Sequence, residues 1–565
     1  MPSTYLVACH TDNIGAGSTF IAVKGQKEDG SKYILKALQQ GATTIVIEKN
    51  TILSDDVLDA LAHTRAKLLY VDNARQALAQ LSARALDYPA KKLRIVGITG
   101  TKGKTTSSFL LEHVLRNAGY RTALLSTVKN KILDVEFKTN LTTQHPDYLH
   151  NFFALCVENE IDMVIMEVAA QATSLHRVAG LEFDGLIFTN FDKEHAEFYP
   201  TMDEYFAAKV ALLDQLKVGA PLLLNADDVR VSDLCEKFVD AKTFGITNAD
   251  ADYHATVLGN SIEKLEMEVI SRTLQVRPTD SPQGEREREF DSLKRINLEK
   301  QDAEIFADNS LMNSIDVDAC NDSELKLRGQ DGVAQDFSAI HQQDDLPPFV
   351  LRGASETSEL EGSVQIEKNT FICPSLVGAY NAYNILGVAS LCLELGVTSE
   401  KIAQGLLSFT AVPGRLERYD LPNGARCFID YAHNPSSHQA VLSMMRELTD
   451  HLIVVFGAGG DRDKTKRPMM GAIVSTIADV VVITSDNPRS EDPTKIIEDI
   501  LAGISDDKKH KVICDLDREQ AIKKAYAVSK PGSVIMLLGK GPDEYQIIGD
   551  QKFDFSEKGI IKELE

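Results

Sequence analysis

Residues 97–106 read Gly-Ile-Thr-Gly-Thr-Lys-Gly-Lys-Thr-Thr and follow directly on the apolar run Leu93–Val96. This stretch predicts a strand, a glycine-rich turn, and then a helix from Ser107 to Ala118 that Gly119 ends. Backbone N–H groups in such a turn and at a helix N-terminus form a cradle for phosphate oxygens. Lys104 would reach the outer phosphates, and the hydroxyl of Thr105 would bind Mg²⁺. The sequence therefore predicts a nucleotide site, with ATP as the expected nucleotide.

The glycines of this stretch depart from the strict phosphate-loop spacing. That pattern requires glycine at position 98, where the chain has Ile98, and its glycines fall at 97, 100 and 103 instead. A bare Gly-Lys-Thr also occurs in ordinary strand-to-helix turns, which is the alternative interpretation. The flanking strand and helix favour the nucleotide site, which would comprise Gly100, Thr101, Lys102, Gly103, Lys104, Thr105 and Thr106.

Length, charge and cysteine usage limit the class of protein. With 565 residues, the chain has room for about three or four domains. A net charge of -23 argues against non-specific nucleic-acid binding, although local basic residues can still hold a phosphate-bearing substrate. The eight cysteines are scattered, which favours reduced thiols in the cytoplasm over disulfides or zinc. We also expect no membrane span and no secretory signal.

Short apolar runs alternate with helical stretches, which predicts an α/β protein. Residues 1–90 would form a small α/β segment, and strands and helices alternate from Leu93 to about residue 270 in the pattern of a parallel sheet. A further alternating unit starts at Arg426. Between them, residues 271–350 are polar, acidic and aperiodic. We expect a flexible insertion there, with a partner-binding arm as the alternative.

Beyond the phosphate loop, eight further segments carry a resemblance to a known family. They are Glu167-Val-Ala-Ala-Gln-Ala, Phe188-Thr-Asn-Phe-Asp-Lys-Glu-His, Tyr205-Phe-Ala-Ala-Lys209, Gly414-Arg-Leu-Glu, Asp430-Tyr-Ala-His, Gly459-Gly-Asp-Arg-Asp-Lys, Asp486-Asn-Pro-Arg-Ser-Glu-Asp-Pro and Gly539-Lys-Gly. In this order they resemble the Mur ligases, the ATP-dependent enzymes that add amino acids to the peptidoglycan precursor. The likeness is greatest to the members that add the third residue, and it spans nearly the whole chain apart from the insertion.

The resemblance implies a three-domain architecture. An N-terminal domain (1–90) would bind the UDP-substrate, a central domain (91–417) with a P-loop-type parallel sheet would bind ATP, and a C-terminal Rossmann-like domain (418–565) would bind the amino acid. ATP would phosphorylate a carboxylate of UDP-MurNAc-L-Ala-D-Glu, and the amine of a diamino acid would attack the acyl phosphate. The resemblance implies ATP and Mg²⁺ as cofactors, small-molecule substrates, no nucleic acid and a monomer.

The reaction centre implied by the resemblance combines cations and metal ligands. Lys104, Lys209 and His195 would be catalytic, and Mg²⁺ would be held by Thr105, Glu167, His195 and an N-carboxylated Lys209. Glu167 also follows a strand at the edge where α/β proteins bind ligands, and a carboxylate there suits Mg²⁺. The alternatives are a solvated strand-end Glu167, a structural or exposed His195, and a surface Lys209.

Further positions match residues that bind the nucleotide or the substrates in the family. Asn381, Asn384, Arg415 and Asp430 would contact the nucleotide. Thr142, Thr143 and Arg177 would contact the UDP-substrate. The amino acid would be bound by Arg462, Asp486, Asn487, Pro488, Arg489, Gly539 and Asp543. In the family, Asp-Asn-Pro-Arg marks the enzymes that add meso-diaminopimelate, because a guanidinium binds the distal carboxylate that lysine lacks.

Several positions depart from the family pattern. Ala169, Ala170 and Gln171 replace a Ser-Ser-His sequence, and Thr11-Asp12-Asn13 replaces Asp-Ser-Arg, which weakens the uridine assignment. Asp543 replaces a glutamate that contacts the ammonium-bearing end of the amino acid. L-Lysine is therefore the first competitor of meso-diaminopimelate. Two further hypotheses are a related ligase such as folylpolyglutamate synthetase and a nucleotide-binding scaffold without catalysis.

Overall fold

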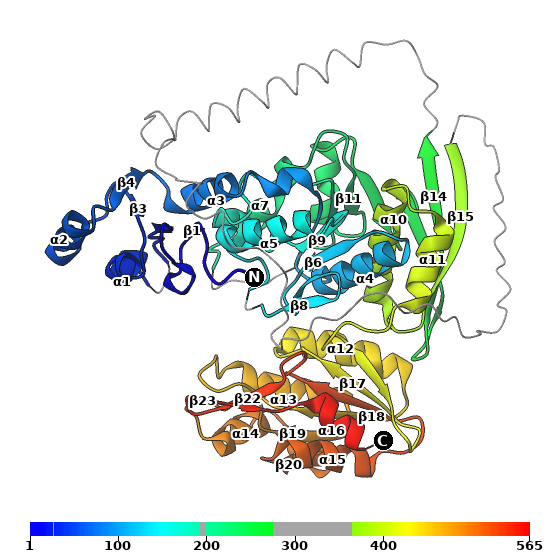
Figure 1. Ribbon diagram of the computed structural model, residues 1–565. Coiled ribbons are helices and arrows are strands. Elements are labelled where there is room, and N and C mark those ends of the chain that lie inside the picture. Colours follow the sequence, from blue (N-terminus) through cyan, green and yellow to red (C-terminus); the bar gives the residue numbers. More distant parts are fainter. Residues whose placement is uncertain (26–27, 140, 193–197, 275–363, 565) are drawn as a thin grey trace, which may run out of the picture. The chain divides into compact units, whose positions relative to one another are not determined.

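A computed structural model describes residues 1–565 except 26–27, 140, 193–197, 275–363 and 565. The chain divides into two compact units. The first comprises residues 1–253, 270–368 and 387–398, and the second comprises 254–269, 369–386 and 399–565. Parallel sheets with connecting helices dominate both units (Figure 1). The expected α/β class and parallel sheets are confirmed.

The N-terminal part of the first unit is a four-stranded parallel sheet in the order β1-β2-β3-β4. Its strands are β1 (Val7–Ala8), β2 (Thr19–Ile21), β3 (Thr44–Glu48) and β4 (Lys67–Val71). Its helices are α1 (Ile34–Gln39), α2 (Asp55–Thr64) and α3 (Ala74–Ala85). The backbone N–H of Cys9 donates to Asp147 Oδ2 at 3.1 Å, which joins this sheet to the rest of the unit.

The large sheet has the strand order β15-β14-β13-β12-β11-β10-β5-β9-β6-β7-β8. Its strands are β5 (Arg94–Thr99), β6 (Thr122–Leu125), β7 (Asn130–Ile132), β8 (Val135–Phe137), β9 (Met163–Glu167), β10 (Gly185–Phe188), β11 (Leu222–Asn225), β12 (Lys242–Gly245), β13 (Tyr253–Asn260), β14 (Leu265–Leu274) and β15 (Val364–Cys373). The central strands β6, β9, β5, β10, β11 and β12 pair in parallel. Apart from β12, these strands read largely as apolar runs because both of their faces are buried.

The helices that follow these strands are short or of medium length. They are α4 (Lys104–Asn117), α5 (Pro146–Glu158), α6 (Ala170–Ser174), α7 (Met202–Val210), α8 (Val229–Ser232), α10 (Ala379–Glu394) and α11 (Ser399–Ser408). The carboxyl ends of β5, β9 and β10 lie at one edge of the sheet because these strands are parallel neighbours. The predicted phosphate loop follows β5, so this edge positions the candidate site.

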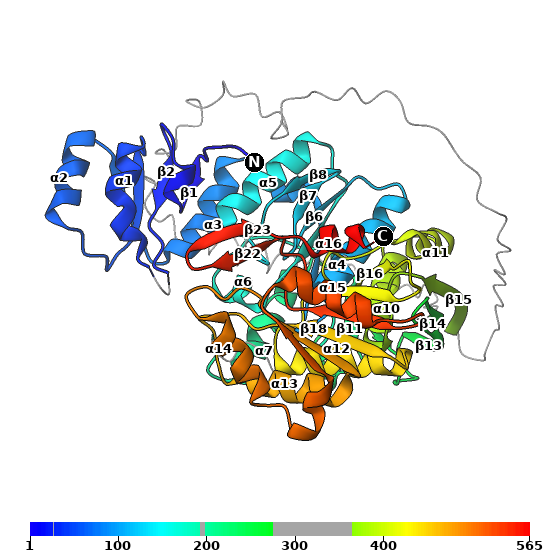
Figure 2. The same cartoon turned by 90° about the horizontal axis from the view of Figure 1, so that it is seen from below.

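The second unit is built on a six-stranded sheet in the order β16-β17-β21-β18-β19-β20, with only β16 antiparallel to its neighbour. The strands are β16 (Glu417–Asp420), β17 (Arg426–Asp430), β18 (Leu452–Phe456), β19 (Val480–Thr484), β20 (Val512–Asp515) and β21 (Val534–Leu538). The hairpin β22 (Tyr545–Ile548) and β23 (Gln551–Asp554) follows near the C-terminus (Figure 2).

Helices cover both faces of this sheet, as in a Rossmann-like domain. On one face, α12 (Pro435–Leu448), α13 (Lys466–Ile477) and α14 (Pro493–Leu501) pack on the side chains of Val454 and Phe456. On the other face, α15 (Arg518–Val528) and α16 (Glu557–Glu563) pack on the alternate positions, including Ile453 and Val455. The alternation follows from the two-residue period of a strand.

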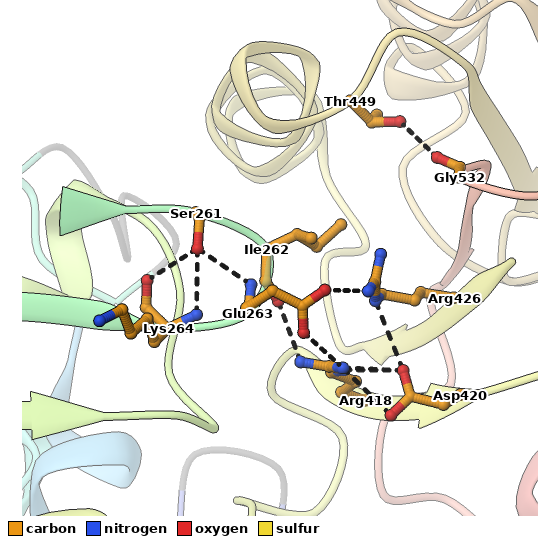
Figure 3. Close-up of polar contacts among 9 residues, drawn as sticks. All are labelled: Ser261, Ile262, Glu263, Lys264, Arg418, Asp420, Arg426, Thr449 and Gly532. Carbon is orange, nitrogen blue, oxygen red and sulfur yellow. Dashed lines mark hydrogen bonds and ion pairs between the residues drawn. The ribbon is translucent and has the colours of Figure 1, made fainter. Parts of the chain in front are cut away.

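The turn between β13 and β14 also belongs to the second unit (Figure 3). Glu263 in this turn accepts a hydrogen bond from Arg418 at 3.1 Å and forms an ion pair with Arg426. Arg418 also donates to the backbone carbonyl of Ile262 at 3.1 Å and pairs with Asp420 at 2.8 Å. The side chain of Ile262 packs against the same apolar cluster as α12. The turn is therefore held to β16 and β17 by both charge and apolar contact.

Three expected boundaries differ from the structure. The helix expected over Ser107–Ala118 begins earlier, at Lys104, because Gly103 adopts a positive φ of 85° and ends the loop there. Strand β14 runs to Leu274 and therefore contradicts the first residues of the expected insertion 271–350, whose remainder lies outside the described residues. The sequence predicts that organised structure resumes near Thr370, whereas strand β15 already begins at Val364. In the described part of the chain, no helix is long and apolar enough to cross a membrane.

A buried histidine makes the second unit sensitive to acid. His438 on α12 is fully buried, its Nε2 lies 3.3 Å from the carbonyl of Ala432, and Nδ1 has no partner among the described residues. Burial lowers the pKa of His438 to about 4. The unfolded chain therefore binds more protons between about pH 6.5 and pH 4, so the free energy of unfolding falls as the pH falls through this window.

We expect His438→Gln to remove this part of the acid sensitivity. Between pH 7 and pH 5 the wild type should lose about 2 kcal/mol more stability than the variant. Urea unfolding of the second unit, followed at several pH values, measures the difference. His510→Gln, at an exposed position of the same unit, is the matched control and should leave the slope unchanged. If the free energy of unfolding depended on pH in the same way in the wild type and in His438→Gln, this would contradict the assignment of the acid sensitivity to His438.

Candidate active site

The phosphate loop lies between β5 and α4, as the sequence predicts. Gly100 has a φ of 140°, and a Cβ built on it would lie 2.0 Å from Thr189 Oγ1, so only glycine fits there. The loop leads into the N-terminus of α4, whose first-turn N–H groups have no acceptor within the helix. The loop therefore has the shape and polarity of a phosphate cradle.

The segment after β10 fixes the shape of this loop. The backbone carbonyl of Asn190 accepts a hydrogen bond from the backbone N–H of Thr101 at 2.9 Å. Its side-chain Oδ1 accepts a second one from the backbone N–H of Lys102 at 2.8 Å. Thr189 Oγ1 donates to the carbonyl of Lys102 at 2.6 Å. Lys102 itself points to Asp192, with Nζ 2.8 Å from Oδ2. Sequence reasoning assigned no role to Thr189 or Asn190, although both lie in the Phe188–His195 segment that carries part of the family resemblance.

Glu167 is the buried carboxylate of the site. It ends β9, has no exposed surface, and accepts from Thr105 Oγ1 at 3.0 Å. Thr127 donates to it twice, from its backbone N–H at 3.0 Å and from Oγ1 at 3.1 Å. Burial raises the pKa of Glu167, although the hydrogen bonds from Thr127 and Thr105 and the charge of Lys104 oppose the shift. The alternative of a solvated strand-end glutamate is wrong.

Two lysines donate to the same backbone carbonyl. Lys104 Nζ lies 2.9 Å from the carbonyl oxygen of Gly100, and Lys209 Nζ lies 2.7 Å from the same oxygen. Lys209 is 2% exposed and its ammonium lies 4.7 Å from the centre of the Tyr205 ring. The alternative of a surface lysine is therefore wrong. Two ammonium groups on one oxygen attract an anion such as a phosphate.

The candidate residues for the UDP-substrate join the same edge of the sheet. Thr143 Oγ1 donates to the carbonyl of Glu167 at 3.0 Å, and Thr142 Oγ1 lies 3.0 Å from Thr127 Oγ1. Arg177 donates to the carbonyl of Thr143 at 2.8 Å. Burial lowers the pKa of Arg177, and the charge of Arg75 lowers it further. Arg177 Nε has no hydrogen-bond partner among the described residues, so the guanidinium retains a buried donor for a ligand.

His195 lies outside the described residues, so its predicted role at a metal is not addressed by the structure. Within the described chain, no group of three or more His, Cys, Asp and Glu side chains could hold a metal ion on its own. The donor set of Thr105 and Glu167 nevertheless suits Mg²⁺, because this ion takes one or two protein oxygens together with substrate phosphates. A ready-made protein cage is therefore not required.

The remaining candidate nucleotide residues belong to the second unit. Asn381 and Asn384 lie at the start of α10. Asn384 Nδ2 donates to Asn381 Oδ1 at 2.9 Å, and Asn381 Nδ2 donates in turn to the carbonyl of Val377 at 2.7 Å. Arg415 lies over the ring of Tyr431 at 4.9 Å. Burial raises the pKa of Asp430, and the positive charge of Arg415 opposes this shift.

The candidate amino-acid residues gather at the carboxyl edge of the second sheet. Asp486, Asn487, Pro488 and Arg489 follow β19, and Arg462 follows β18. Arg489 donates from its guanidinium to the carbonyl of Gly460 at 2.7 Å. A Cβ on Gly459 would lie 3.0 Å from this guanidinium and 3.6 Å from Arg462, so both arginines lie beside Gly459.

Gly539 and Asp543 come from the turn after β21. A Cβ on Gly539, whose φ is 111°, would lie 3.2 Å from Asp486 Oδ2, so the glycine brings this turn close to the Asp486 carboxylate. Burial raises the pKa of Asp543, while Lys540 and the hydroxyl of Tyr545 oppose the shift. The turn thus adds the Asp543 carboxylate to a site to which Arg462 and Arg489 bring positive charge.

Family models match three parts of the chain. Residues 4–85 match the Mur ligase family, catalytic domain; residues 98–278 match the Mur ligase middle domain; and residues 414–541 match the Mur ligase, glutamate ligase domain. The UDP-N-acetylmuramoyl-L-alanyl-D-glutamate--2,6-diaminopimelate ligase of Clostridium botulinum is 32% identical over 553 residues, covering 97% of this chain and 92% of that protein. The chain belongs to the Mur ligase family. A second such ligase, from Clostridium acetobutylicum, is 32% identical over 96% of this chain and 91% of its own length.

Solved structures support the fold of this Mur ligase. A UDP-N-acetylmuramoyl-L-alanyl-D-glutamate--2,6-diaminopimelate ligase matches with a TM-score of 0.59 at 22% identity, over 99% of this chain and 94% of that one. A MurF of Acinetobacter baumannii matches with a TM-score of 0.55 at 14% identity, over 100% of this chain and 94% of that one. The expected three-domain Mur ligase architecture is confirmed, and as a Mur ligase the protein is an ATP-dependent, ADP-forming enzyme that uses Mg²⁺ in peptidoglycan precursor synthesis.

Proposed function

We propose that this Mur ligase adds meso-diaminopimelate to UDP-MurNAc-L-Ala-D-Glu. The observation that carries the proposal is the Asp486-Asn-Pro-Arg489 loop, in which a guanidinium beside Gly459 lies among the predicted amino-acid residues. A guanidinium binds a carboxylate through two parallel hydrogen bonds, and meso-diaminopimelate has a distal carboxylate that L-lysine lacks. The names of the relatives from Clostridium support the same substrate pair.

The residues around the phosphate loop would carry out the first half-reaction. The γ-phosphate of ATP passes to the substrate carboxylate, which gives ADP and an acyl phosphate. Lys104, whose Nζ meets that of Lys209 at the Gly100 carbonyl, would stabilise the negative charge on the transferring group. Thr105 and Glu167 would hold Mg²⁺, which neutralises charge on the phosphate oxygens. Lys209 would act as its N-carboxylated anion and, with His195, complete the metal ligands.

The second half-reaction would take place at the amino-acid residues. The amine of the incoming amino acid attacks the acyl carbon, the carbon–oxygen bond to phosphate breaks, and the amine loses a proton. Asp486 and Asp543 are suited to an ammonium group, and Arg462 and Arg489 to carboxylates. Asn487, Pro488 and Gly539 would shape the loop and turn that present these charges.

The remaining candidate residues fit the nucleotide and the UDP-substrate. Asn381, Asn384, Arg415 and Asp430 would contact the nucleotide, as would Gly100, Thr101, Lys102, Gly103 and Thr106 of the loop. Thr142, Thr143 and Arg177 would contact the UDP-substrate, and the buried unpaired Nε of Arg177 supports an anionic ligand there. We assign residues 1–90 to UDP-substrate binding, 91–417 to ATP binding and 418–565 to amino-acid binding, which the ranges of the three family models support.

We also propose that the enzyme acts as a monomer in the cytoplasm. All seven cysteines within the described residues are free, which is typical of a reducing compartment. No nucleic acid takes part, consistent with the net charge of -23.

The test is ADP release with ATP, Mg²⁺ and UDP-MurNAc-L-Ala-D-Glu, measured in parallel with meso-diaminopimelate, L-lysine, L-ornithine and no amine. We expect turnover with meso-diaminopimelate alone. L-Lysine is the second candidate, because Asp543 is one methylene shorter than the glutamate usual in the family. Turnover with L-lysine instead would support the proposed ligation reaction but reject meso-diaminopimelate as the amino acid. Absence of turnover with every amine, from folded protein that binds ATP, would reject both.

A further inference from the structure

The hairpin β22–β23 is fastened to the Asp486–Arg489 loop by a ladder of polar contacts. Gln546 Nε2 donates to the carbonyl of Asp486 at 2.7 Å, and the backbone N–H of Ile547 donates to Asn487 Oδ1 at 2.9 Å. Arg489 N donates to the carbonyl of Ile547 at 3.1 Å, and Gly549 N donates to the carbonyl of Arg489 at 2.8 Å. Every residue of the loop except Pro488 is therefore bonded to one strand of the hairpin or to the turn that follows it.

The buried ammonium group of Lys540 also links the Asp486–Arg489 loop to the hairpin. Lys540 is 1% exposed, and its Nζ lies 3.3 Å from Asp486 Oδ1, 3.3 Å from Asn487 Oδ1 and 2.7 Å from the carbonyl of Tyr545. Burial lowers the pKa of Lys540, and the charge of Asp486 opposes the shift. One side chain thus joins two residues of the loop to the first residue of the hairpin.

These contacts impose an unusual backbone conformation on Arg489. Its φ is 51°, in the left-handed region that is strained for a non-glycine residue. The hydrogen bonds of its N–H and its carbonyl both end on the hairpin, at Ile547 and Gly549. The conformation therefore persists because the hairpin holds both sides of the residue. Its guanidinium direction depends on the same contacts, since the side chain starts from this backbone.

We propose that Gln546 and Lys540 are positioning residues that set the selectivity for an amino acid with a distal carboxylate. They do not touch the substrate; they hold the backbone from which Arg489 projects. A two-point guanidinium–carboxylate contact requires placement within about 0.5 Å, so loosening the loop weakens the distal contact first. The inference rests on the proposed function, because it concerns the same amino-acid site.

The test compares Gln546→Ala with Gln551→Ala, a glutamine at an exposed position of the same hairpin. For Gln546→Ala we expect the KM for meso-diaminopimelate to rise about tenfold. The kcat at saturation and the KM for ATP should stay within about twofold, and the preference for meso-diaminopimelate over L-lysine should fall accordingly. Gln551→Ala should behave as the wild type. Lys540→Met, which removes the ammonium group at similar side-chain length, should shift the KM in the same direction.

Two outcomes would overturn the inference. One is an unchanged KM and an unchanged amine preference in Gln546→Ala. The other is an equal loss of kcat/KM for every amine with a raised KM for ATP, which would indicate a general structural defect.

Hydrogen exchange separates this inference from the proposed substrate. Without any ligand, the amides of Arg489 and Gly549 should exchange about tenfold faster in Gln546→Ala than in the wild type or Gln551→Ala. If the wild type uses L-lysine alone, the proposed substrate is wrong, but faster exchange still supports the positioning role. Unchanged exchange overturns the role whichever amine is used.

Discussion

Replacing Lys104 by alanine should lower the rate of ADP release by about a thousandfold, or about 4 kcal/mol in the activation free energy. Lys104 Nζ lies 2.9 Å from each of two loop carbonyls, those of Gly100 and Thr101, at the N-terminus of α4. In the proposed reaction, an ammonium group there would stabilise the negative charge that develops on the transferring phosphoryl group. Alanine leaves the loop glycines in place but removes this charge.

The measurement is steady-state ADP release together with ATP affinity and thermal unfolding. Arg116→Ala is the matched control, because Arg116 lies on the same helix and pairs with Asp134 at the surface. The control should retain the wild-type rate, and Lys104→Ala should unfold at the wild-type temperature. A Lys104→Ala variant with a rate within tenfold of the wild type would reject the role of this lysine in phosphoryl transfer.

Replacing Lys209 should lower turnover by about a hundredfold or more, because we propose that its carboxylated form holds a metal ion at the transferred phosphate. The structure places Lys209 Nζ 2.7 Å from the Gly100 carbonyl that Lys104 also contacts. Adding CO₂ to the ammonium group, with loss of two protons from Nζ, converts one of two adjacent cations into a carbamate anion. This change relieves the repulsion between the ammonium groups and supplies oxygen ligands that suit Mg²⁺.

Two substitutions distinguish the cation from its carboxylated form. Lys209→Arg retains a positive charge but cannot form the carbamate, so it should be as inactive as Lys209→Ala. An active Lys209→Arg would contradict carboxylation and favour a simple cationic role. Intact-protein mass measurement under CO₂ should show one added carboxyl group on the wild type only. Lys237→Ala, which removes an exposed lysine paired with Asp214, is the control and should be fully active.

The sequence was sufficient to predict the phosphate loop and its surroundings because local patterns encode them. The order of strand, glycine-rich turn and helix around Lys104 is a property of adjacent residues. Glu167 was predictable for a similar reason, because an apolar run ends directly before it and parallel strands end at one edge of a sheet. Its hydroxyl partner Thr105 was named from the loop pattern alone.

Contacts between distant segments were not predictable in the same way. Asn190 braces the backbone of Thr101 and Lys102, and Thr127 donates twice to Glu167, but neither pairing leaves a local sequence signal. The ladder between Gln546 and Asp486 joins residues 60 positions apart. The burial of Lys209 could not be predicted from the sequence either, because a lysine among apolar neighbours on a helix is compatible with a surface position.

Strand β14 was not predicted in full, although its sequence has a recognisable strand pattern. Strand β14 alternates buried and half-buried residues from Leu265 through Met267 and Val269 to Ser271, which is the two-residue period of a strand. The alternation was obscured because the following residues are polar and charged. The sequence pattern also predicts a single helix over Met202–Leu216, which is longer than α7 for a comparable reason. Apolar residues continue past Val210, but they form a 3₁₀ turn at Leu213–Gln215.

The adjacency of β14 and β15 has a consequence for how this chain tolerates change. The two strands are neighbours in the sheet, yet residues 275–363 separate Leu274 from Val364. The entropy of closing a loop grows only with the logarithm of its length, so each doubling costs about 0.6 kcal/mol. A change in the number of residues between Leu274 and Val364 therefore alters the closure entropy of this strand pair by little, while the phosphate loop and the amino-acid loop are encoded elsewhere in the sequence.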